Sequence, residues 1–206
     1  MLAAILMIAA MVAVVTPACA DQTPTDVVKA LVNPALQILN DKSTPLKERQ
    51  QKLRQLVSGD VFDYTAMARS ALGLHWKDLN DQQRQDFTQS FTAFLRDSYI
   101  SRIQDFSVQQ VNYLGASDLD AGRTEVKTTV DQGNGKAPVP INYMLRQDGG
   151  KWLIYDVTVD NISIAANYRN QFNRVINNQG FDTLMADLKS KQQGLEDQLG
   201  TAHAHD

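Results

Sequence analysis

Cysteine is almost absent from this chain of 206 residues, which contains one, Cys19. A single cysteine cannot close an intramolecular disulfide, so the fold has to rely on its hydrophobic core. A surplus of basic residues is also absent, because 20 Lys and Arg stand against 23 Asp and Glu, a net charge of −3. This balance, with no block of like charge, argues against a nucleic-acid partner.

Recognisable catalytic motifs are scarce as well. No glycine-rich phosphate loop follows a predicted strand, and no serine elbow is present. His75 is the one histidine in the body of the chain, and a lone histidine is more often a packed or surface residue than a base. Asp156 and Asp160 could form an acid–base pair, although solvated strand carboxylates are commoner. His203 and His205 in the tail offer too few ligands for a rigid metal site.

Charged residues are missing from positions 1–20, which read MLAAILMIAAMVAVVTPACA. An apolar run, a proline and the triplet Ala18-Cys19-Ala20 are typical of a signal peptide, with cleavage expected after Ala20. No Lys or Arg precedes the apolar run. An uncleaved anchor helix and a lipoprotein acylated at Cys19 are the alternatives, the first disfavoured by the short run and the second by a poor lipobox. We therefore predict an exported protein with a signal peptide (1–20), a single domain (21–200) and a disordered tail (201–206).

The chain does contain apolar residues at helical spacing, both before and after a central stretch of residues 107–160. Apolar residues recur at a spacing of three or four, and the segments start and stop at Pro, Asn, Asp, Ser or Gly. Asp60 is expected to cap the third helix, and Asn80 with Gln83 resembles a capping box. The predicted helices cover residues 24–40, 45–57, 60–70, 80–103, 162–178 and 181–193.

The central stretch alternates with period two and is punctuated by turn residues, including Asp148-Gly149-Gly150. Pro138 and Pro140 suggest that the third strand begins at an edge or a bulge. The predicted strands cover residues 107–116, 123–132, 137–147 and 152–160. The fold class is therefore α+β, with a four-stranded, mainly antiparallel sheet packed with several helices.

Two apolar surfaces follow from these periods. On the last strand, Leu153, Tyr155, Val157 and Val159 are expected to share one face. The long helix carries an aromatic stripe that includes Phe91 and Tyr99. Periodicity alone does not distinguish a dry core between these surfaces from a cavity.

The sequence resembles the MlaC family, also called the toluene-tolerance family, in two separated segments that together span nearly all of the chain after residue 20. The matching residues are Phe62, Asp63, Leu72, Gly73, Trp76, Gln83, Arg84, Phe87 and Tyr99, then Trp152, Tyr155, Asp156, Val157, Val159, Asn167, Tyr168, Arg169, Phe172 and Gly180. Asp160-Asn161 departs from the family pattern, which usually has a glycine at this turn.

The resemblance implies a periplasmic carrier that shuttles glycerophospholipids between the outer and inner membranes. It implies no cofactor, phospholipid as cargo, and two docking partners: an inner-membrane lipid ABC transporter with its lipid-binding substrate subunit, and an outer-membrane lipoprotein complex. Arg146 and Arg169 are the candidates for weak head-group contacts. The implied lining of an apolar lipid pocket is Phe91, Tyr99, Val111, Tyr113, Val130, Ile141, Tyr143, Leu145, Leu153, Tyr155, Val157, Val159, Tyr168 and Phe172.

Two functions of other classes stay open at the level of sequence. One is a periplasmic enzyme that uses an apolar cavity, with Asp156 or His75 as its base. The other is an interaction module with a filled core and no ligand.

Overall fold

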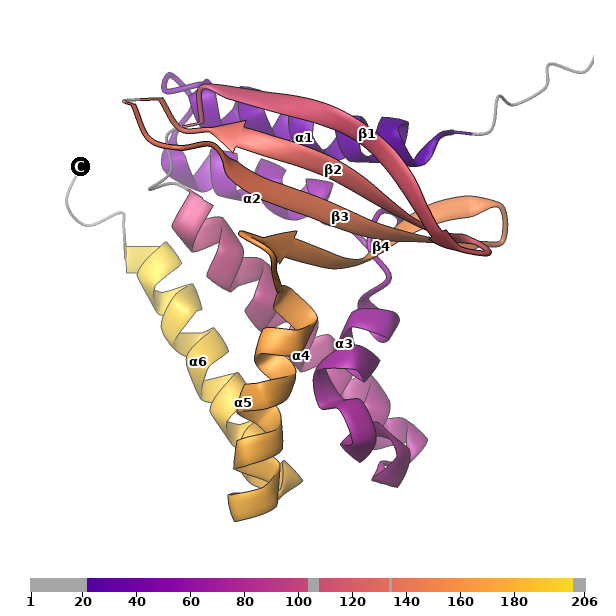
Figure 1. Cartoon of the computed structure of the whole chain (residues 1–206). Coiled ribbons are helices and arrows are strands. Elements are labelled where there is room, and N and C mark those ends of the chain that lie inside the picture. The colour runs from indigo at the N-terminus through magenta and orange to yellow at the C-terminus, as the bar shows by residue number, and fades with distance from the viewer. Residues whose placement is uncertain (1–21, 104–107, 134, 202–206) are drawn as a thin grey trace, which may run out of the picture.

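The computed structural model of the protein describes residues 22–103, 108–133 and 135–201. Its strands lie at one end of the molecule with α1 and α2 alongside them, and α3–α6 form a helical layer at the other end (Figure 1). The helices are α1 (Pro24–Asn40), α2 (Leu46–Leu56), α3 (Tyr64–Leu72), the 3-10 turn η1 (Gly73–Asp78), α4 (Asp81–Ile103), α5 (Ile164–Gln179) and α6 (Phe181–Thr201). The strands are β1 (Gln110–Asp120), β2 (Arg123–Asp131), β3 (Val139–Asp148), β4 (Lys151–Val159) and β5 (Ile162–Ser163).

The sheet is an antiparallel meander in the order β1-β2-β3-β4-β5. This confirms the α+β class and the four predicted strands, and adds the two-residue strand β5. Asp160 and Asn161 form the tight turn into β5, with φ of 51° and 63°. Asp and Asn tolerate this left-handed conformation better than other residues with a side chain, so the turn forms without the family's usual glycine.

Two buried clusters hold the layers together. The first lies within the helical layer and is built from residues of α3–α6, including Phe87 and Phe91. The second lies where α1 covers the sheet, and joins Val28 to Val126 and other strand residues. Phe62 and Val157 pack against both clusters. The boundary between the clusters, which we call the seam, therefore runs past Val157 on β4.

The N-terminus of α3 differs from the prediction. Asp63, and not Asp60, is the N-cap, because its side chain accepts a hydrogen bond from Ala66 N at 2.9 Å. The preceding residues pair with β4: Asp63 N donates to Ile154 O, and Ile154 N donates to Val61 O, both at 2.9 Å. This pairing delays the helix by three residues, and the sequence carries no local signal for it.

Two other local predictions have different outcomes. The capping box of α4 is confirmed, because Gln83 N donates to Asn80 Oδ1 at 2.8 Å and Asn80 N donates to Gln83 Oε1 at 3.0 Å. For Pro140, no register shift interrupts the β2–β3 pairing, so the bulge is not found there. The β3–β4 pairing begins only at Ile141, so Pro140 pairs with β2 alone and sits at a local edge, as expected.

The turn between α1 and α2 makes a pH-dependent prediction. The carboxylate of Asp41 accepts hydrogen bonds from the hydroxyls of Ser43 and Thr44, both at 2.5 Å. These bonds lower the pKa of Asp41 from 3.8 to about 2, and the bond from Ser43 has the largest effect. A lowered carboxyl pKa means that this turn's stabilisation is complete above pH 3.8 and is lost as the pH falls through about 2.

We expect a carboxyl NMR titration to give Asp41 a midpoint near pH 2, and Ser43→Ala to move that midpoint toward 3.8. Equal midpoints in the two proteins would contradict this account of the turn.

Candidate functional site

The inner face of the sheet is the face covered by α1 and by the helical layer. Residues that pair across neighbouring strands point to the same face of the sheet. The fully buried Val126, Leu145 and Ile154 mark the inner face, and the register identifies the other residues on it. The predicted pocket residues on this face are Val111, Tyr113, Val130, Ile141, Tyr143, Leu145, Val157 and Val159. All are half-buried except Leu145, which is fully buried.

A bulge in β4 corrects the predicted face of this strand. Leu145 pairs with Ile154, but the next residue pair is Met144 with Asp156, so Tyr155 is an extra residue. Ile154 and Val157 therefore both point inward, while Leu153 lies on the outer face opposite Arg146. The prediction that Leu153 and Tyr155 share a face with Val157 is wrong.

Asp156 provides the physical reason for the bulge. Its carboxylate accepts hydrogen bonds from Val157 N at 2.9 Å, Ser163 Oγ at 2.5 Å and Ala165 N at 3.2 Å. These bonds tie β4 to the start of α5. Tyr155 is left on the outer side, where it interacts with the guanidinium of Arg123.

Four apolar side chains at one end of the inner face do not belong to either buried cluster. They are half-buried and together form an apolar strip across three strands. Val159 pairs with Ile141, and Val139 pairs with Val130, so the strip is continuous across the sheet. Apolar surface of this kind, next to the seam, is the part of the inner face that a ligand could cover. We call Val130, Val139, Ile141 and Val159 the inner-face strip.

The helical side of the predicted pocket divides in two. Phe91 and Phe172 are 1% and 5% exposed and meet edge-to-face with ring centroids 5.5 Å apart, so they are packed core. Tyr99 and Tyr168 are half-buried and pack against the same cluster. In this structure the pocket residues with accessible surface are therefore the tyrosines and the inner-face residues other than Leu145, and the phenylalanines are enclosed.

Of the two arginines predicted near a head group, Arg146 is paired on the outer face and Arg169 is exposed on the helical layer. Arg146 lies on the outer face, where it forms an ion pair with Asp63 and a longer one, 3.3 Å, with Asp148. Arg169 is exposed on α5 and lies against Gly73. A Cβ on Gly73, which has φ of 57°, would meet Arg169 Cδ at 3.0 Å. Both arginines thus join α3 or η1 to a neighbouring element.

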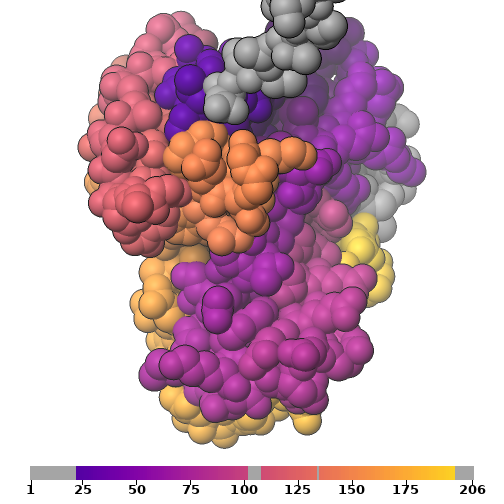
Figure 2. Space-filling model, turned by 90° about the vertical axis from the view of Figure 1, so that its right-hand side faces the viewer, coloured from indigo at the N-terminus to yellow at the C-terminus, as the bar shows by residue number. Residues whose placement is uncertain are grey.

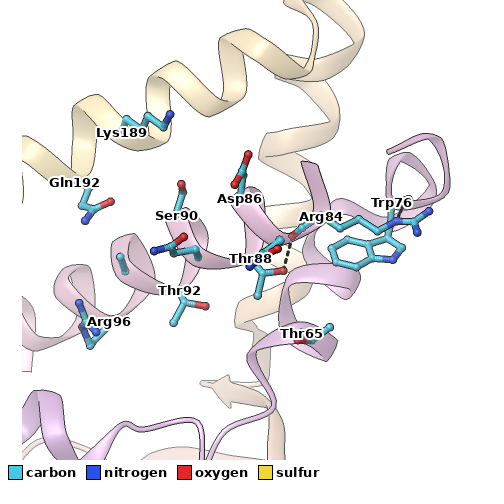
Figure 3. A pocket seen from close by; sticks show the side chains of 13 residues that line it. Thr65, Trp76, Arg84, Asp86, Thr88, Ser90, Thr92, Arg96, Lys189 and Gln192 are labelled. Carbon is cyan, nitrogen blue, oxygen red and sulfur yellow. Dashed lines mark hydrogen bonds between the residues drawn. The ribbon is translucent and has the colours of Figure 1, made fainter. Parts of the chain in front are cut away.

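Polar grooves occur on the outside of the helical layer. The larger one, about 1100 Å³, runs along α4 between α3 and α6 (Figure 3). Its lining is hydrophilic apart from Ala93 and Trp76. Trp76 lies under Arg84, with the guanidinium carbon 5.8 Å from the ring centroid. A smaller groove, about 380 Å³, lies between α2 and α4 and includes Arg54 and Asp97. Neither groove has the apolar walls that acyl chains require.

The candidate acids and bases are placed in surface or capping roles. His75 is half-buried and its Nε2 lies 2.8 Å from Asn173 Oδ1. Asp156 accepts the three hydrogen bonds described above, and Asp160 is in the turn before β5. Within the described part of the chain, no three His, Cys, Asp or Glu side chains are grouped to hold a metal ion. His203 and His205 lie outside the described residues, as does Cys19.

Comparison with known families identifies the chain. The family model for the MlaC protein matches residues 29–190, which is most of the sequence. The chain belongs to the MlaC family.

Individual relatives agree with this assignment. The chain is 21% identical over 178 residues to the intermembrane phospholipid transport system binding protein MlaC of Haemophilus influenzae, covering 84% of this chain and 83% of that protein. It is 26% identical over 167 residues to the toluene tolerance protein ttg2D of Pseudomonas putida, covering 79% and 77% respectively.

A solved structure is similar over nearly its whole length. It is the phospholipid-binding protein of Ralstonia solanacearum in complex with a phospholipid, with a TM-score of 0.69 and 26% identity. The match covers 82% of this chain and 97% of that protein. Among the described residues, no helix is both long and apolar enough to cross a bilayer.

The residues that carry the family resemblance are mostly architectural. Asp63 caps α3 and pairs with Arg146, Gly73 allows the close approach of Arg169, and Arg84 donates to Trp76 O at 3.1 Å. Figure 2 shows the side of the molecule where the β3–β4 hairpin and α3 form one continuous surface. The residues of these motifs therefore identify the scaffold of the family.

Proposed function

We propose that this protein is a periplasmic phospholipid carrier. The observation that carries the proposal is the structural match to a protein in complex with a phospholipid, over 97% of that protein. The apolar inner-face strip and the seam beside Val157 are where we place the acyl chains. The head group would lie outside the apolar inner face, because the paired strand residues on that face include no Lys or Arg.

The energetics explain why a carrier is needed. A diacyl lipid has roughly 30 methylenes, so at about 0.8 kcal/mol each its tails cost about 24 kcal/mol to hold in water. Crossing an aqueous compartment without a protein is therefore excluded. A pocket that recovers most of this free energy makes transfer from a membrane nearly neutral, and binding to partners can then set the direction.

The proposed partners follow from the family. They are an inner-membrane ABC transporter with its lipid-binding substrate subunit, and an outer-membrane lipoprotein complex. Export would depend on residues 1–20 as a signal peptide. The transfer between partners needs no covalent step, which agrees with the surface and capping roles of His75 and Asp156.

Purified protein is expected to carry phospholipid without any being added. Native mass spectrometry should give the polypeptide plus one or more lipids, and organic extraction should identify them. A bare polypeptide mass after gentle purification would favour the interaction module with a filled core. A lipid recovered in chemically altered form would favour the enzyme.

Head-group preference is expected to be weak, because Arg146 is paired with Asp63 on the outer face and Arg169 lies on the exposed surface of α5. Exchange assays with phosphatidylglycerol and phosphatidylethanolamine should differ by less than about tenfold, which is the effect of one good charged contact. A hundredfold preference would instead reveal a specific head-group site.

A further inference from the structure

Tyr143 occupies the middle of the inner face. It lies on the central strand β3, directly opposite Val126 on one side and Val157 on the other. Leu145 and Ile141 flank it along the strand. It packs against the cluster under α1 and stands next to the seam. Its hydroxyl thus lies among mainly apolar side chains, with Tyr113 nearby.

The hydroxyl of Tyr143 has no hydrogen-bond partner among the described residues. Two other half-buried phenols have partners: Tyr64 donates to Val57 O at 2.6 Å, and Tyr113 donates to Asn33 Oδ1 at 2.8 Å. The hydroxyl is also not sealed in by protein, since the fully buried side-chain atoms without a partner in the described part of the chain are Arg49 Nε and Thr92 Oγ1. Tyr143 therefore keeps a free donor in contact with accessible space.

Burial raises the pKa of Tyr143 well above its usual value, and nearby Tyr113 adds to the rise. No cation of the described residues acts in the opposite direction. The phenol is therefore protonated at any physiological pH and acts as a hydrogen-bond donor. A neutral acceptor suits this position better than a charged one, because a buried phosphate without a cation beside it would be strongly unfavourable.

We propose that the Tyr143 hydroxyl donates a hydrogen bond to an acyl-ester carbonyl of the bound glycerophospholipid. The inference rests on the proposed function and adds the group that the protein recognises. An ester carbonyl is the neutral acceptor that lies next to the acyl chains, at the boundary between the apolar and polar parts of such a lipid. This hydrogen bond sets how deeply the lipid is inserted between the sheet and the helical layer. Its acyl chains then lie along the inner-face strip.

The test compares ester and ether lipids in the full-length mature protein. Delipidated protein is incubated with vesicles that contain equal amounts of dipalmitoyl phosphatidylglycerol and its dihexadecyl ether analogue, and bound lipid is quantified by mass spectrometry. The two lipids share head group and chain length and differ in the carbonyls. Wild type should favour the ester lipid by about threefold to tenfold, the usual range for one hydrogen bond. Tyr143→Phe should reduce this ratio to the value in the vesicles.

Tyr64→Phe is the matched control, because its hydroxyl already has a partner in Val57 O. It should lower the melting temperature and leave the ester preference unchanged. Tyr143→Phe should leave the melting temperature of the delipidated protein unchanged or raise it, since no native bond is lost.

The possible failures are distinguishable. Equal binding of both lipids by wild type, or an ester preference that survives in Tyr143→Phe, would overturn the inference while leaving the carrier function intact. Failure of wild type to take up either lipid would overturn the proposed function itself.

Discussion

Val157→Glu is expected to empty the carrier of lipid while the protein stays folded. Val157 points to the inner face and packs against both buried clusters at the seam. A carboxylate placed against acyl chains has no partner there, so it costs several kcal/mol or is forced to take up a proton. Lipid recovered with the purified protein should fall by at least about tenfold, since each 1.4 kcal/mol of lost affinity is tenfold. The circular dichroism spectrum should stay close to that of wild type, because position 157 is half-buried and water can reach the new carboxylate there.

Leu153→Glu is the matched control on the same strand. The bulge at Tyr155 places Leu153 on the outer face, directly opposite Arg146. The new carboxylate meets a guanidinium across the strand pair, and opposite charges there are tolerated. Lipid content should remain near that of wild type. Loss of lipid in Leu153→Glu with retention in Val157→Glu would show that the outer face holds the ligand. Unfolding of Val157→Glu would show that the seam is dry core.

This pair of variants also marks the limit of what the strand pattern could predict. In the segment Trp152-Leu153-Ile154-Tyr155 both faces are apolar, so alternation does not choose between them. The choice is made by Asp156, whose carboxylate collects hydrogen bonds from Ser163 and from the start of α5. Such a bond between segments has no signature in the local pattern. As a result Trp152 and Ile154, which point inward, were missed, and Leu153 was included.

Elements whose signals are local were predicted well. The capping box of Asn80 and Gln83 placed the start of α4 correctly, and the glycines of the β3–β4 turn placed that hairpin. The start of α3 was misplaced because residues 61–63 pair with β4, which is distant in sequence. The aromatic stripe was located correctly, but its packing was not, since enclosure of Phe91 depends on Phe172 of α5. Contacts between distant segments thus account for the errors in both the fold and the site.

Arg54→Met is expected to give the largest loss of stability among the variants considered. The carboxylate of Asp97 is buried in α4, with its side chain 2% exposed. It pairs with Arg54 Nε of α2 at 2.9 Å and with Arg96 Nε at 3.4 Å. Removing Arg54 leaves the buried carboxylate with the longer contact alone. Breaking a buried pair costs about 3–5 kcal/mol, and we expect about 2–3 here because the side chain of Arg54 is 30% exposed.

In a chain of this size that loss corresponds to a fall in melting temperature of about 5–10 °C. Lys52→Met on the same helix is the control, because its ion pair with Glu48 is on the surface and contributes little. The double variant Arg54→Met/Asp97→Leu should recover at least half of the lost stability, since it removes the buried charge together with its partner. A double variant less stable than Arg54→Met would mean that Asp97 stabilises α4 independently of Arg54. Equal effects of Lys52→Met and Arg54→Met would mean that the α2–α4 contact is held by apolar packing alone.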